Sequence, residues 1–99
     1  MKLTILNNEE LNILCKTHEV ENLYLFGSSL SENFHKESDI DFLVKFNTQD
    51  LFNYFNNYLS LKEKLAKLFN RKIDLVEVQS LKNPILINSI NKTKQLIYG

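Results

Sequence analysis

Three aspartates stand out as residues whose type and spacing could do chemistry. Asp39 and Asp41 are two positions apart, and Asp74 lies much later, inside the run Lys72-Ile-Asp-Leu-Val76. Residues two apart in a strand point to the same face of a sheet, so Asp39 and Asp41 should project side by side. Two carboxylates this close repel each other unless a cation neutralises them, and Mg²⁺ or Mn²⁺ is the cation that suits clustered carboxylate oxygens. The pattern therefore indicates a divalent-metal site.

A second motif, Gly27-Ser28, is separated from Asp39 by ten residues and follows an aromatic and aliphatic run. It should end a buried strand in a tight turn. The turn meets the start of the Asp39 strand if those two strands are antiparallel, and Asp74 joins them if its strand is a parallel neighbour. The glycine lets the backbone approach a ligand closely, while the serine hydroxyl and the following amides can donate to phosphate oxygens. A phosphate-binding turn beside a carboxylate cluster indicates nucleotide chemistry.

The elements that must position these residues alternate between helix and strand. Apolar residues at helical spacing predict helices over about 8–18, 50–69 and 84–91, whereas strand-forming runs predict strands over 22–26, 39–46, 72–78 and 95–98. The polar piece 29–38 holds at most a short helix, and Pro84 suits the first turn of its helix. The order gives an α/β (α+β) fold with a small mixed β-sheet flanked by helices, and we expect residues 1–99 to form a single domain.

The chain resembles the minimal nucleotidyltransferases of the polymerase-β-like superfamily, whose pattern is Gly-Ser, about ten residues, Asp-x-Asp and a later single Asp. The resemblance implies the polymerase-β-like nucleotidyltransferase fold, and it is specific because the blocks occur in order at suitable spacing. The blocks that carry it are Phe26-Gly-Ser28, Ser38-Asp-Ile-Asp-Phe-Leu-Val44, Arg71-Lys-Ile-Asp-Leu-Val76 and, similar to the C-terminal end of the family, Lys82-Asn-Pro-Ile-Leu86 to Leu96-Ile-Tyr98.

Carried over to this sequence, the resemblance implies a role for each candidate residue. Asp39 and Asp41 would bind two Mg²⁺ ions, and Asp74 would bind the ion that activates the attacking hydroxyl, so all three are expected to be catalytic. The triphosphate of the substrate ATP would lie against Gly27, Ser28 and Ser29. The reaction implied is transfer of AMP to a hydroxyl, with a tyrosine of a HEPN-type toxin as the expected acceptor and this chain as its antitoxin.

One departure from the family keeps an alternative open. Many members follow Gly-Ser with arginine and glycine, whereas here the sequence is Ser29-Leu-Ser-Glu-Asn33, and Glu32 would face a triphosphate poorly. Positive charge would have to come from Lys36, Arg71 or Lys72. The alternative is a catalytically weak or inactive antitoxin that neutralises its partner by binding alone.

Composition excludes several other classes of function. Twelve Lys plus Arg balance twelve Asp plus Glu, so a basic excess for direct nucleic-acid binding is missing. The apolar runs are shorter than the roughly 20 residues of a membrane span, and charges interrupt the N-terminal one, so neither a membrane partner nor a signal peptide is expected. The single cysteine, Cys15, cannot form an internal disulfide. The cytoplasm is the expected location.

The remaining conspicuous residues favour structural roles. His18 and His35 have no partner at ligand spacing and are expected at the surface, while Cys15 should be a small buried hydrophobe. An isolated Asp39 or Asp41 could simply cap a turn or sit on a solvated strand edge, and Lys62, Lys64 and Lys67 should form a solvated face.

Phe52 and Leu59 lie outside the apolar stripe of the long helix, so they either contact a partner or meet the first or last helix. That stripe is Leu51, Tyr54, Phe55, Tyr58, Leu61, Leu65 and Leu68.

Overall fold

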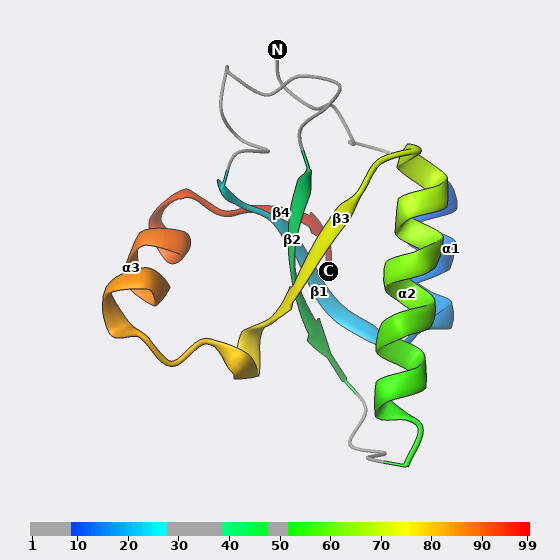
Figure 1. The fold of residues 1–99 in the computed structure, drawn as a ribbon, viewed down its shortest axis with the longest axis horizontal. Helices are drawn as coiled ribbons and strands as arrows, with labels where there is room; N and C mark the ends of the chain where they lie inside the picture. Colours follow the sequence, from blue (N-terminus) through cyan, green and yellow to red (C-terminus); the bar gives the residue numbers. More distant parts are fainter. Residues whose placement is uncertain (1–8, 28–38, 48–51) are drawn as a thin grey trace.

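A computed structural model of the 99-residue chain describes residues 9–27, 39–47 and 52–99. Helices and strands alternate along it, as predicted (Figure 1). A short 3₁₀ helix that the sequence analysis did not predict follows the third strand. The elements in chain order are α1 (Glu9–Thr17), β1 (Val20–Leu25), β2 (Ile40–Phe46), α2 (Tyr54–Phe69), β3 (Ile73–Glu77), the 3₁₀ helix (Val78–Ser80), α3 (Pro84–Thr93) and β4 (Gln95–Tyr98).

The four strands form one mixed sheet in the order β3-β2-β1-β4. β1 is antiparallel to both β2 and β4, whereas β2 and β3 are parallel. The prediction of a small mixed sheet is therefore confirmed, and so are the two pairings that the site requires: the glycine-ended strand is antiparallel to the Asp39 strand, and the Asp74 strand is its parallel neighbour.

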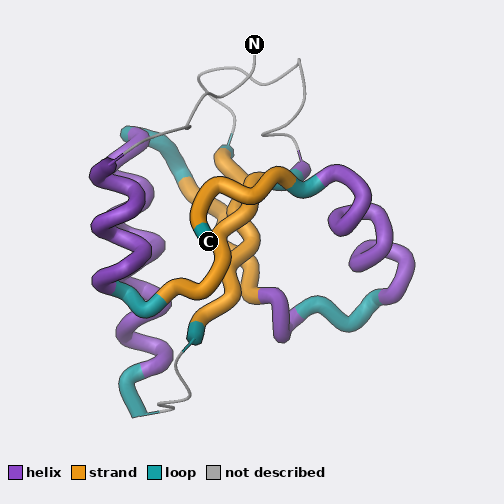
Figure 2. Tube along the Cα trace, turned by 180° about the vertical axis from the view of Figure 1, so that it is seen from behind, coloured by secondary structure: helices purple, strands orange, loops and turns teal. Residues whose placement is uncertain are grey.

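Helices lie on both sides of this sheet. α1 and α2 lie side by side against one face, and α3 lies on the other side (Figures 1 and 2). The main core fills the space between the sheet and the α1–α2 pair. Its buried members come from both helices and from the three longer strands: Leu11, Cys15, Val20, Leu23, Leu25, Ile40, Phe42, Val44, Phe46, Leu61, Leu65, Ile73 and Leu75.

The central strand β2 is covered on both faces, as its nearly continuous apolar sequence predicted. Phe42 and Val44 belong to the core under α1 and α2. Leu43 has the opposite parity and therefore points to the α3 side, yet it is buried as well. A strand held on both faces is a rigid support for the residues at its start.

His18 corrects one expectation. It is only 4% exposed, so the prediction of a surface histidine is wrong. Its Nδ1 lies 2.8 Å from the Leu14 carbonyl oxygen and its Nε2 lies 3.0 Å from Ser60 Oγ, while Asn57 Nδ2 donates to the His18 carbonyl oxygen at 2.8 Å. The ring is buried because both nitrogens find partners where the end of α1 meets α2. His35 lies outside the described residues.

Other details of the helices also refine the expectations. α2 begins at Tyr54, later than expected, and Phe55 is 67% exposed although the stripe predicted it to be core. Phe52 and Leu59 are exposed, at 95% and 44%, whereas Leu61 on another side of α2 is buried in the core. Cys15 is buried as predicted, and burial raises the pKa of its thiol to about 12.

α3 begins as its sequence indicated. Pro84 occupies the first turn, and the Asn83 side-chain oxygen accepts hydrogen bonds from the amides of Ile85 and Leu86 at 2.9 and 3.4 Å. Among the helices that the structure describes, none combines the length and apolar character needed to cross a membrane.

Truncation of the core residue Leu61 should test the α2–sheet packing. Leu61→Ala is expected to lower the free energy of unfolding by about 2–5 kcal/mol, because the substitution leaves a cavity in a closed core. Leu59→Ala, on the exposed side of the same helix, should lower it by less than about 1 kcal/mol. Urea unfolding of both variants measures the difference, and similar losses would contradict this placement of α2.

Candidate functional site

The parallel pairing of β2 and β3 sets two of the candidate carboxylates side by side. Asp41 is the register partner of Asp74, so both side chains leave the same face of the sheet from adjacent strands. The residues on either side, Ile40 with Ile73 and Phe42 with its own partner in β3, are buried on the opposite face. The alternation between core and acid therefore directs both carboxylates away from the core, toward the α3 side.

Asp39 lies directly before β2 and is exposed. We expected Asp74 to join Asp39 if their strands were parallel neighbours, and the register places Asp74 level with Asp41, two residues further along. A hydrogen bond from the Ile40 amide to the Lys72 carbonyl oxygen, 3.1 Å long, fixes this offset. Asp39 is thus the residue at the open end of the pair, two positions before Asp41.

The glycine turn lies directly against this pair. The Phe26 amide donates to the Asp41 carbonyl oxygen at 3.1 Å, which holds the end of β1 beside the start of β2. Gly27 has a φ of +63°, a left-handed conformation, and a Cβ built on it would lie 2.6 Å from Oδ2 of Asp41. Only glycine fits here without displacing the carboxylate, so the turn and the acid share one small space.

Tyr58 of α2 fixes the strand that carries Asp74. Its hydroxyl donates to the carbonyl oxygen of Leu75, the next residue in β3. The pKa of Tyr58 is raised, first by burial and then by the negative charges of Glu77 and Asp74. The sequence analysis missed this residue, because its position in the apolar stripe of α2 gave no sign that its hydroxyl would anchor β3.

The donor set suits a divalent metal. Three carboxylates supply the hard oxygen ligands that Mg²⁺ prefers, and the glycine turn leaves the space that a Cβ would fill. Within residues 9–27, 39–47 and 52–99, no three His, Cys, Asp or Glu side chains already form a group arranged to hold a metal. The backbone therefore brings the acids to one end of the sheet, whereas their side chains do not close around an ion. Their assignment as ligands stays a prediction.

The structure describes only part of the predicted phosphate-binding turn. Ser28 and Ser29 lie outside the described residues, as do Glu32 and Lys36. Of the other two candidate cations, Arg71 is half-buried, and its amide donates to the Ala66 carbonyl oxygen. Lys72 is exposed and lines a groove on the α2 side of β3. Lys72 thus lies on the helix side of the strand that carries Asp74.

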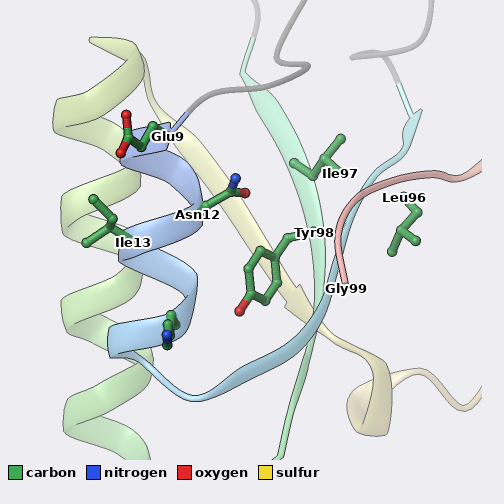
Figure 3. A pocket seen from close by; sticks show the side chains of 8 residues that line it. Glu9, Asn12, Ile13, Leu96, Ile97, Tyr98 and Gly99 are labelled. Atoms are coloured by element: carbon green, nitrogen blue, oxygen red, sulfur yellow. The ribbon is translucent and has the colours of Figure 1, made fainter.

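A further groove of about 480 Å³ lies between α1 and β4 (Figure 3). β4 is the edge of the sheet opposite β3, so this groove is separated from the carboxylates by the width of the sheet. None of the candidate site residues lines it, and its size alone therefore does not mark it as the site. The groove is lined by Glu9, Asn12, Ile13, Lys16, Leu96, Ile97, Tyr98 and Gly99.

A mixed sheet of this order, with acids on neighbouring strands beside a glycine turn, is the architecture of a nucleotidyltransferase. A family profile described as polymerase beta, nucleotidyltransferase matches residues 9–99. The chain belongs to this family, and it is therefore an enzyme of the nucleotidyltransferase class.

The chain is also similar to individual proteins of related name and structure. A protein named as a protein adenylyltransferase from Methanocaldococcus jannaschii is 37% identical over 86 residues, which are 87% of this chain and 83% of that protein. A solved minimal nucleotidyltransferase is 25% identical, with a TM-score of 0.72 over 88% of this chain and 85% of its own. A chain in the crystal structure of a toxin–antitoxin with AMP-PNP is 27% identical, with a TM-score of 0.70 over 95% of this chain and 74% of its own.

Gly27→Ala should test the contact between the turn and Asp41. An alanine in the left-handed conformation destabilises the fold by about 1–2 kcal/mol, and its Cβ must displace the Asp41 carboxylate. We expect Mg²⁺-dependent ATP binding, measured by calorimetry, to fall about tenfold or more. Glu19→Ala, at another left-handed position in the turn between α1 and β1, should leave nucleotide binding unchanged.

Asp41→Asn and Asp39→Asn should separate function from stability. In metal-free buffer each variant is expected to have the melting temperature of the wild type or a slightly higher one. The free energy of unfolding should change by no more than about 1 kcal/mol, because one of two repelling charges is removed. Addition of Mg²⁺ should raise the melting temperature of the wild type and of the surface variant Glu10→Gln, but not of the two aspartate variants. Unfolding of either aspartate variant without metal would mean that the acids are structural.

Proposed function

We propose that this chain transfers AMP from ATP to a hydroxyl group of a partner protein in a Mg²⁺-dependent reaction. The observation that carries the proposal is the placement of Asp41 beside Asp74 with the Gly27 turn against it. The M. jannaschii relative, named as a protein adenylyltransferase, supports AMP as the transferred group. The chain in the toxin–antitoxin structure with AMP-PNP supports an adenine nucleotide as the substrate.

The candidate residues would bind either the metal ions or the triphosphate. Asp39 and Asp41 would hold two Mg²⁺ ions together, Asp74 would hold the ion nearer the acceptor, and Gly27, Ser28 and Ser29 would bind the triphosphate. When bound, the ions would lower the pKa of the attacking hydroxyl and neutralise the departing pyrophosphate. The half-buried Asp41 is the residue that both the turn and β3 contact, so it orients the nucleotide relative to the acceptor.

The proposed reaction is an in-line displacement. The acceptor oxygen forms a bond to the α-phosphorus of ATP while the bond from that phosphorus to the bridging oxygen of the β-phosphate breaks. AMP stays on the acceptor, pyrophosphate leaves, and the hydroxyl proton is released to solvent. The exposed side of Asp74, on an edge strand, leaves room for a protein acceptor to approach.

For the partner, we infer a HEPN-type toxin with a tyrosine as the acceptor, so that this chain acts as its antitoxin in the cytoplasm. The likeness to a chain of a toxin–antitoxin complex supports this role. The proposal treats residues 1–99 as a single nucleotidyltransferase domain. The competing proposal is an antitoxin that neutralises its partner by binding alone, and it is favoured by acid side chains that are not arranged around a metal position.

Mass spectrometry of the intact partner tests the transfer. A candidate HEPN-type partner is incubated with the chain, ATP and Mg²⁺, and we expect its mass to rise by one or more AMP units. Asp39→Asn should prevent the increase while leaving the fold intact. A partner whose mass does not change although its toxicity is neutralised would refute the transfer and favour binding alone.

A further inference from the structure

A second groove lies next to the strand that carries Asp74. Its volume is about 440 Å³, and it runs between α2 and the start of β3. Four of its lining residues come from α2 and two come from the segment directly before Asp74: Leu59, Lys62, Glu63, Ala66, Lys72 and Ile73. This groove therefore lies at the same edge strand as Asp74, on the face of the sheet opposite to the Asp74 carboxylate, whereas the groove between α1 and β4 lies at the other edge.

The groove continues along α2 as an exposed apolar surface. Phe52 is 95% exposed, Phe55 67% and Leu59 44%. Positions 55, 59 and 66 follow one another at steps of four and seven residues and lie on one side of the helix, while the core residues Leu61 and Leu65 lie on another. Aromatic and leucine side chains exposed in a row are typical of protein-binding surfaces, because their burial stabilises a complex.

The charges around the groove are unbalanced. Glu63 pairs with Lys67 one turn further along α2, at 3.4 Å. Lys62 and Lys72 form no ion pair with any residue in the described ranges. The apolar groove is thus flanked by two lysines without a counter-charge, and it fits a partner that carries acidic residues beside an apolar side chain.

The edge of β3 itself is partly closed. The hydroxyl of Tyr58 donates to the Leu75 carbonyl oxygen, so the middle of this edge is occupied by α2. A partner that added as a strand along β3 would have to displace this hydrogen bond, so docking through side chains at the α2 side is favoured. From Ile73 in the groove, the next residue along the chain is Asp74, whose charge also raises the pKa of Tyr58.

We propose that the groove between α2 and β3, with Phe55 at its outer end, is the docking surface for the acceptor protein. The acceptor presents an apolar side chain to Leu59 and acidic residues to Lys62 and Lys72. From this contact the acceptor has to pass around the β3 edge of the sheet, so that its hydroxyl group meets the nucleotide at Asp74 on the opposite face. The inference rests on the proposed function, since it assigns the acceptor's contact surface to that same site.

Binding of the HEPN-type partner in the absence of nucleotide tests the docking surface separately from catalysis. By calorimetry with purified proteins, Leu59→Ser and Lys62→Glu are each expected to weaken binding about tenfold or more. The matched controls are Ile85→Ser and Lys92→Glu, an exposed apolar residue and a lysine on α3, which should bind as the wild type does. Mg²⁺-dependent ATP binding should be the same for Leu59→Ser and the wild type.

The outcomes distinguish the two proposals. Wild-type binding that Leu59→Ser and Lys62→Glu leave intact overturns the docking surface, even if AMP transfer occurs. Binding that both variants weaken, without any AMP transfer by the wild type, refutes the proposed function and supports the groove as the contact surface of a binding-only antitoxin. If the wild type does not bind the partner, or if the α3 controls weaken binding equally, the docking surface is overturned.

Discussion

The parallel register between β2 and β3 is the constraint on which the rest of the structure depends. Ile40 opposite Ile73 is buried under α1 and α2, and the next pair, Asp41 opposite Asp74, faces the other way. A shift of one residue in either strand would turn a carboxylate into the core and an isoleucine out of it. The core therefore selects the register, and the register selects which acids are neighbours. The chemistry of the site is in this sense a consequence of hydrophobic packing on its far face.

Much of this arrangement could be predicted from the sequence, because it follows from alternation and local turn chemistry. The strand runs around Asp41 and Asp74 have the residue types of buried strands, and the glycine that ends β1 marks a turn that other residues adopt at a cost in energy. Pro84 marks the start of α3 equally well. Such features depend on residues close together in the chain, so a single sequence reveals them.

Features that depend on distant contacts could not be predicted in the same way. His18 is buried because Ser60, 42 positions later, offers its ring a hydrogen-bond partner. Phe55 has the helical spacing of a core residue, but the direction in which α2 meets the sheet leaves it exposed. The exact level of Asp74 relative to Asp39 likewise depends on where the two strands pair. Sequence patterns indicate which residues belong to an element, whereas the packing of the elements decides which side of it faces water.

The two edges of the sheet differ in a way that bears on self-assembly. At β3 the Tyr58 hydroxyl donates a hydrogen bond to the Leu75 carbonyl oxygen. In the part of the chain that the structure describes, β4 pairs only with β1. A sheet that can extend at one edge alone cannot grow into an open-ended array. If two copies joined through β4, both outer edges of the joined sheet would be β3 strands covered by α2, and the association would stop at two chains. One tyrosine on a helix thus limits how far strand pairing can propagate.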